Sequence, residues 1–84
     1  MRIYMQMRDT EDQPPKYCQL QLEPDLLGGW MLVREVGNVG SAGRVKREFF
    51  GEPVEAERAM IELRDAQLKR GFQVVFVQGQ VAHR

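Results

Sequence analysis

A chain of 84 residues, of which 43% are hydrophobic, is long enough for one domain with a thin core, and this composition excludes a disordered chain. Twelve basic and twelve acidic residues leave no net charge, which argues against coating nucleic acid through bulk positive charge. Cys18 is the single cysteine, so an internal disulfide is excluded, and we expect this side chain to be a small buried hydrophobe. The first residues contain no apolar run of a signal peptide or membrane span, so we expect a cytoplasmic protein.

Alternating apolar and polar residues predict strands in the first half of the chain. Residues 1–7 have this period, and we expect them to form an additional strand at one edge of the sheet. The acidic, proline-containing residues 9–16 predict an exposed connection. Alternation returns over residues 17–23, and residues 29–36 and 44–50 predict two more strands joined by a glycine-rich turn.

The period then changes to that of a helix. Residues 53–70 place apolar side chains three and four positions apart, at Ala56, Ala59, Met60, Leu63 and Ala66. Pro53 suits the first helical position, and Gly71 suits the C-terminal end. Residues 72–77 are apolar on both faces, so we expect a last strand that is central or covered. Together these elements predict an α+β fold over residues 1–84, an antiparallel sheet of about four to five strands with one amphipathic helix packed on one face.

The connection between the third and fourth predicted strands has the strongest functional signal. Glycine recurs at Gly37, Gly40 and Gly43, a spacing typical of a turn whose backbone adopts positive φ or closely approaches another group. Polar and basic residues surround this turn and predict a contact site for a phosphate or a partner carboxylate: Arg34, Asn38, Arg44, Lys46 and Arg47. A solvated strand edge explains the basic residues equally well, and a salt bridge is an equal alternative for Arg34.

Catalytic motifs are missing from the sequence. It contains no nucleophile elbow, no Walker loop and no dinucleotide fingerprint, because the three glycines have the wrong spacing and lie between strands. The one histidine, His83, and the one cysteine are too few for a metal site. We therefore expect neither an enzyme nor a cofactor.

Several features follow one another in a characteristic order: the strand at 17–22, the turn ending in Gly29-Trp30, the pair Arg34-Glu35, the glycine turn, the helix entry at 52–56, and the helix end Lys69-Arg70-Gly71-Phe72. In this order they resemble the WGR domain, above all the short bacterial members in which the domain stands nearly alone. The resemblance covers residues 16–72 and leaves the strand at 1–8 outside it.

The signature of that family is altered in this chain, which has Val36, Gly37 and Asn38 where the family has tryptophan, glycine and arginine. In the DNA-damage-responsive poly(ADP-ribose) polymerases, the tryptophan packs on the sugar and base of a DNA end and the arginine adds polar contacts. The resemblance therefore implies a non-enzymatic module that binds DNA weakly through the glycine-turn hairpin. The residues expected to contact DNA are Val36, Gly37, Asn38, Arg44, Lys46 and Arg47.

A protein-interaction or homodimerising module is the alternative, one that has lost binding to DNA ends. In this interpretation Val36 leaves an apolar spot at the tip of the hairpin, and the strand at 1–8 pairs with the edge of a neighbouring molecule. The salt dependence of binding separates the two hypotheses, because binding to phosphate weakens steeply as the salt concentration rises and binding through an apolar interface does not.

Overall fold

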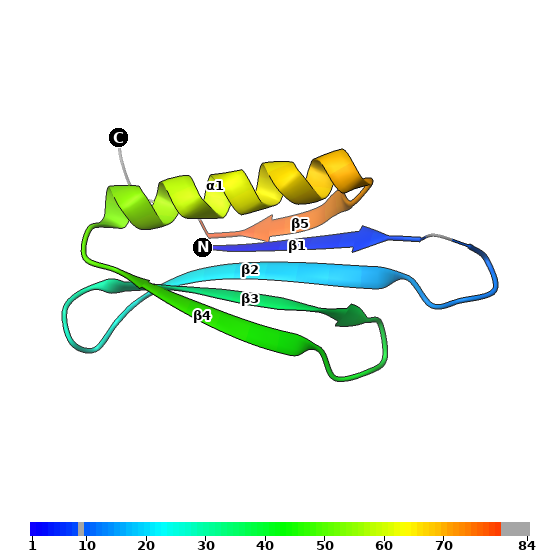
Figure 1. Cartoon of the computed structure of the whole chain (residues 1–84), viewed down its shortest axis with the longest axis horizontal. Coiled ribbons are helices and arrows are strands. Elements are labelled where there is room, and N and C mark those ends of the chain that lie inside the picture. Colours follow the sequence, from blue (N-terminus) through cyan, green and yellow to red (C-terminus); the bar gives the residue numbers. More distant parts are fainter. Residues whose placement is uncertain (9, 80–84) are drawn as a thin grey trace.

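The computed structural model describes residues 1–8 and 10–79 as one antiparallel sheet with one helix on a single face (Figure 1). The strands follow the order β4-β3-β2-β1-β5, and all four neighbouring pairs are antiparallel. The elements are β1 (Arg2–Met7), β2 (Lys16–Pro24), β3 (Trp30–Asn38), β4 (Arg44–Phe50), α1 (Pro53–Arg70) and β5 (Gln73–Gln78). This architecture confirms the predicted α+β class. His83 lies outside the described residues.

Strand alternation produces a core on the side of the sheet that faces α1. The buried residues on this helix face come from three neighbouring strands and from the helix and its exit: Ile3, Met5, Cys18, Leu20, Leu22, Leu32, Ala56, Met60 and Phe72. Each large apolar side chain removed from water contributes about 1.5–3 kcal/mol. Cys18 is fully buried, as expected, and burial raises the pKa of its thiol, against the opposing charges of Arg34 and Arg70. This cysteine is a core residue.

The helix begins and ends where its sequence predicts. Pro53 occupies the first turn, and Gly71 ends the helix in a left-handed conformation, with φ 110°. One detail of the predicted buried face is wrong: Ala66 is exposed, and Gln67 is buried instead. Residues 56, 60, 63 and 67 repeat at four, three and four positions, so position 67 continues the buried stripe more closely than position 66 does. The Gln67 side chain accepts a hydrogen bond from Arg70 Nη1 at 3.2 Å.

The first and last strands of the sequence have exchanged places in the sheet relative to expectation. β1 pairs with β2 on one side and with β5 on the other, so it is a central strand and not an edge strand. β5 is an edge strand, and all six of its residues are exposed rather than covered. The physical reason is the crossover by α1, which carries the chain across the sheet and returns it beside the first strand (Figure 1).

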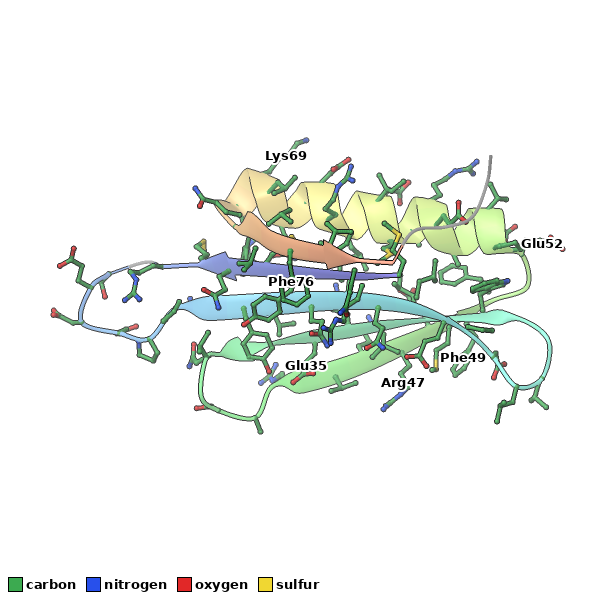
Figure 2. The ribbon with its side chains drawn as sticks, turned by 180° about the vertical axis from the view of Figure 1, so that it is seen from behind. Glu35, Arg47, Phe49, Glu52, Lys69 and Phe76 are labelled. Carbon is green, nitrogen blue, oxygen red and sulfur yellow. The ribbon has the colours of Figure 1, made fainter. Side chains whose placement is uncertain are left out.

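The face of the sheet opposite α1 is called the open face below. Residues on this face alternate with the core residues along β1, β2 and β3. The open face also includes Arg47 of β4, across from Val33, and Phe76 of β5, across from Tyr4, and Figure 2 labels both together with Glu35 of β3. Within the described part of the chain, no helix is both long and apolar enough to span a membrane.

Candidate nucleic-acid interface

The turn between β3 and β4 depends on glycine at one position for its conformation. Gly40 has φ +92°, a region that side chains rarely adopt, and the space around its missing side chain is empty. The Ser41 backbone N–H donates to the Asn38 carbonyl oxygen at 3.0 Å, which closes the turn. The Val39 N–H donates to the Pro15 carbonyl oxygen at 2.9 Å and ties the turn to the loop before β2.

Gly37 and Gly43 are required for a different reason, which is close packing. A Cβ atom on Gly37 would lie 2.8 Å from the Cα of Gly43 and 3.2 Å from the Tyr17 ring. A Cβ atom on Gly43 would collide with the Tyr17 hydroxyl group and lie 2.8 Å from the Val36 carbonyl oxygen. Both roles expected of the glycine spacing, positive φ and close approach, therefore occur in the same hairpin.

Tyr17 fills the space that these glycines leave open, although it is not among the residues expected at the site. It lies directly across from Gly37 in the β2–β3 register, and its hydroxyl donates to Glu35 Oε2 at 2.6 Å. This hydrogen bond, together with desolvation and the nearby carboxylate charge, raises the pKa of Tyr17 to about 12. An aromatic residue across from a strand glycine was the available signal, because such pairs fill the gap beside the glycine.

Basic residues of β3 and β4 gather on the helix face around a hollow of about 410 Å³. In the cross-strand register Arg34 lies opposite Lys46, and Val36 lies opposite Arg44. Val36 is half-buried and packs against the core, so it belongs to the hollow and not to the tip of the hairpin. We call this site the basic hollow; its lining residues are Arg34, Val36, Arg44, Val45 and Lys46.

The cations of the basic hollow form no ion pair within the described part of the chain. Within residues 1–8 and 10–79, Arg34, Arg44 and Lys46 form no salt bridge or side-chain hydrogen bond. Arg34 and Lys46 are also like charges placed directly across from each other, an arrangement that destabilises a sheet.

The remaining predicted contact residues lie elsewhere. Arg47 lies across from Val33 on the open face, so the sheet separates it from Arg44 and Lys46. Asn38 is exposed at the end of β3, on the same face as Val36 but outside the lining of the hollow. Gly37 supports the hairpin through packing. The structure thus brings together three of the residues expected to contact DNA, Val36, Arg44 and Lys46, and places beside them Arg34, for which the sequence leaves a phosphate contact and a salt bridge open.

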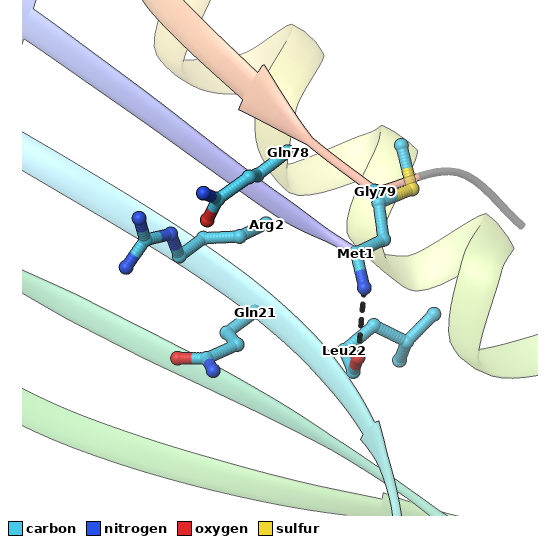
Figure 3. A pocket seen from close by; sticks show the side chains of 6 residues that line it. All are labelled: Met1, Arg2, Gln21, Leu22, Gln78 and Gly79. Atoms are coloured by element: carbon cyan, nitrogen blue, oxygen red, sulfur yellow. Dashed lines mark hydrogen bonds between the residues drawn. The ribbon is translucent and has the colours of Figure 1, made fainter.

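A second, more open hollow of about 270 Å³ lies at the corner where β1, β2 and β5 meet (Figure 3). The Met1 amino group there donates to the Leu22 carbonyl oxygen at 3.2 Å. The Arg2 guanidinium lies 5.1 Å from the centre of the Phe76 ring, and its Nε has no hydrogen-bond partner in the described part of the chain. The lining residues are Met1, Arg2, Gln21, Leu22, Gln78 and Gly79.

Aromatic rings form a row across the open face beside this corner. The centres of the Phe76 and Tyr4 rings are 5.3 Å apart, and those of the Tyr4 and Tyr17 rings are 6.0 Å apart, with interplanar angles of 18° and 23°. Because the rings stack on one another, each covers a face of its neighbour. The row braces the open face, and Phe76 at its end remains 39% exposed.

An antiparallel sheet with one covering helix and a basic hollow beside its glycine hairpin defines a small α+β domain. The sequence model of the WGR domain matches residues 1–78, and the chain belongs to this family. The match includes β1 and β5, both of which lie outside the resemblance at residues 16–72. An uncharacterized protein of Sinorhizobium fredii, y4dW, is 30% identical over 71 residues, which are 84% of this chain and 35% of that protein. The chain thus spans about a third of the length of this relative. No solved structure matches the chain.

Proposed function

We propose that this WGR domain is a non-enzymatic module that binds the phosphate backbone of DNA through the basic hollow. The observation that carries the proposal is the convergence of Arg34, Arg44 and Lys46, none of them paired with an acidic group in the described residues, on a hollow with Val36 in its lining. Charge-assisted hydrogen bonds of this kind contribute about 1.5–3 kcal/mol each. Half-buried Val36 offers an apolar contact for a sugar ring.

The altered signature sets the expected strength of binding. Replacement of the family's tryptophan by Val36 removes a stacking contact worth about 1–3 kcal/mol. The neutral amide of Asn38 replaces a charged donor. Binding that remains is then mainly electrostatic, which makes it weaker and more dependent on salt than binding by a stacked aromatic residue.

A non-catalytic role fits the chemistry of the described residues. They contain no group of three or more His, Cys, Asp or Glu side chains that could hold a metal ion. The cysteine is buried, and its pKa is raised, which is the opposite of what a nucleophilic thiol requires.

The test is a fluorescence-anisotropy titration with a blunt, 5′-phosphorylated duplex at about 50 mM salt. An Arg44→Gln/Lys46→Gln variant is compared with an Arg58→Gln/Lys69→Gln variant, which has the same change in net charge on exposed positions of α1. We expect the first variant to bind about tenfold or more weakly and the second to bind like the wild type. Equal losses in both variants would contradict a located site, and an absence of binding by the wild type would contradict the function.

A protein-docking role is the second candidate, and one observation favours it. Leu26 and Leu27, in the turn between β2 and β3, are 101% and 94% exposed. Burying one such leucine against a partner gains about 1.5–3 kcal/mol, with little sensitivity to salt. A Leu26→Ser/Leu27→Ser variant that keeps its affinity for DNA while losing a protein ligand would separate the two candidates.

A further inference from the structure

β5 is an edge strand whose apolar side chains are exposed on both faces of the sheet. The exposed fractions of Val74, Val75, Phe76 and Val77 are 42%, 54%, 39% and 52%. Among the described residues β5 pairs with β1 alone, so its second row of backbone N–H and C=O groups faces no other strand. A run of exposed apolar residues on a free edge is a template for pairing with another chain.

The two edges of the sheet differ in charge. β4, at the other edge, contains four charged residues in seven positions, and β5 contains neither a charged residue nor a proline. Charged side chains on an edge strand hinder the addition of a further strand, because pairing crowds and desolvates them. In its charges, the sheet is therefore protected at β4 and not at β5.

The sequence of β5, Gln-Val-Val-Phe-Val-Gln, is nearly the same in both directions. In an antiparallel pairing of two copies centred between Val75 and Phe76, Gln73 lies opposite the partner's Gln78, Val74 opposite the partner's Val77, and Val75 opposite the partner's Phe76. Amide meets amide at both ends, and apolar side chains meet in the middle. No pair in this register brings like charges together.

Directly opposed residues must also point to the same face, and a bulge in β5 satisfies this condition. In a regular strand, residues 73 and 78 would point to opposite faces. The pairing with β1 shifts at Val75, so Gln73 and Gln78 lie across from Gln6 and Arg2 on the open face. Val74 and Val77 correspondingly lie across from Met5 and Ile3, which are buried on the helix face. The bulge therefore makes the faces of the two outer residues at each end of β5 symmetric about its centre, as its sequence is.

We infer that two copies of this chain associate through β5 into a dimer with one continuous ten-stranded antiparallel sheet. Such an interface is isologous, because the same surface is used by both copies. A twofold axis perpendicular to the sheet relates the copies and places both helices on the same face. The partner is a second copy because the sequence and the faces of β5 are complementary to themselves.

The test is the sedimentation of the whole chain over about 10 to 500 µM, since the dimer forms by mass action. We expect a dimer for the wild type and an increase of about tenfold or more in the dissociation constant for Val75→Lys, which places a charge on the open edge. The matched control is Val54→Lys on the outer face of α1, where the side chain is 59% exposed, and it should leave dimerisation unchanged. A monomeric wild type, or equal effects of both variants, would overturn the inference. Thermal melts establish that both variants fold.

A cross-linking experiment tests the register. Mixed Gln73→Cys and Gln78→Cys chains should form a disulfide-linked dimer under mild oxidation, because the two positions are directly opposed. Gln73→Cys alone should not, because its two cysteines lie about 17 Å apart in the centred register, beyond disulfide reach. The native Cys18 is fully buried and does not interfere. Cross-linking of Gln73→Cys with itself, or none in the mixture, would overturn the proposed pairing.

Discussion

Replacing Arg44 by glutamine removes one of the three cations of the basic hollow without changing the core, because the Arg44 side chain is exposed. If all three cations contact phosphates, the logarithm of the association constant falls with the logarithm of the salt concentration with a slope of about −2.7. The slope for Arg44→Gln is about −1.8. Between about 50 and 200 mM salt, the affinity of the wild type for a duplex should fall about 40-fold and that of the variant about 12-fold.

The control is Arg47→Gln, which removes the same charge from the same strand but on the open face. Anisotropy titrations of one labelled duplex at four salt concentrations measure the three slopes. We expect Arg47→Gln to keep the slope of the wild type. A slope for Arg47→Gln as shallow as that for Arg44→Gln would refute the assignment of phosphate contacts to the helix face. An unchanged slope for Arg44→Gln would refute its contact with phosphate.

Three further predictions concern stability. The pKa of Tyr17 is raised from 10.0 to about 12, so its hydrogen bond to Glu35 stabilises the fold fully below pH 10 and is lost as pH rises toward 12. Urea unfolding should therefore show that the difference in unfolding free energy between the wild type and Tyr17→Phe shrinks over that range. Gly43→Ala should lower the free energy of unfolding by about 1–3 kcal/mol, because the new methyl group collides with the Tyr17 hydroxyl. An unchanged melting temperature would contradict this packing. Lys46→Gln should raise the stability of the free protein by roughly a few tenths of a kcal/mol, because it relieves repulsion with Arg34. The same change should weaken binding to the duplex. A loss of stability in chemical denaturation would contradict the unpaired state of this site.

Local patterns in the sequence define the elements well but not their neighbours. The period of two predicts the strands, and the period of 3.6 predicts the helix, because each reports which side chains share a face. The same patterns contain no information on which strands pair across a helical crossover. For this reason the expectations of an edge strand at residues 1–7 and of a central or covered strand at residues 72–77 are both wrong.

Part of the site was readable from the sequence, and part was not. Strand alternation alone places Arg44 and Lys46 on one face and Arg47 on the other, although the three residues form one basic cluster in the sequence. The register that brings Arg34 opposite Lys46 depends on the length of the glycine turn, which the sequence does not fix. Whether Arg34 pairs with an acid is a question of tertiary structure, and no side chain in the described residues neutralises it.

The corner hollow of Figure 3 has a consequence for how the domain connects to other segments. Met1 and Gly79 both line it, and a Cβ atom on Gly79 would lie 3.6 Å from the Cα of Met1. A domain whose first and last strands meet at one corner can be inserted into a loop of another domain without forcing the two sides of that loop apart. The same closeness makes the domain suited to circular permutation, with a short linker across the corner and new ends opened at the exposed turn of Leu26 and Leu27.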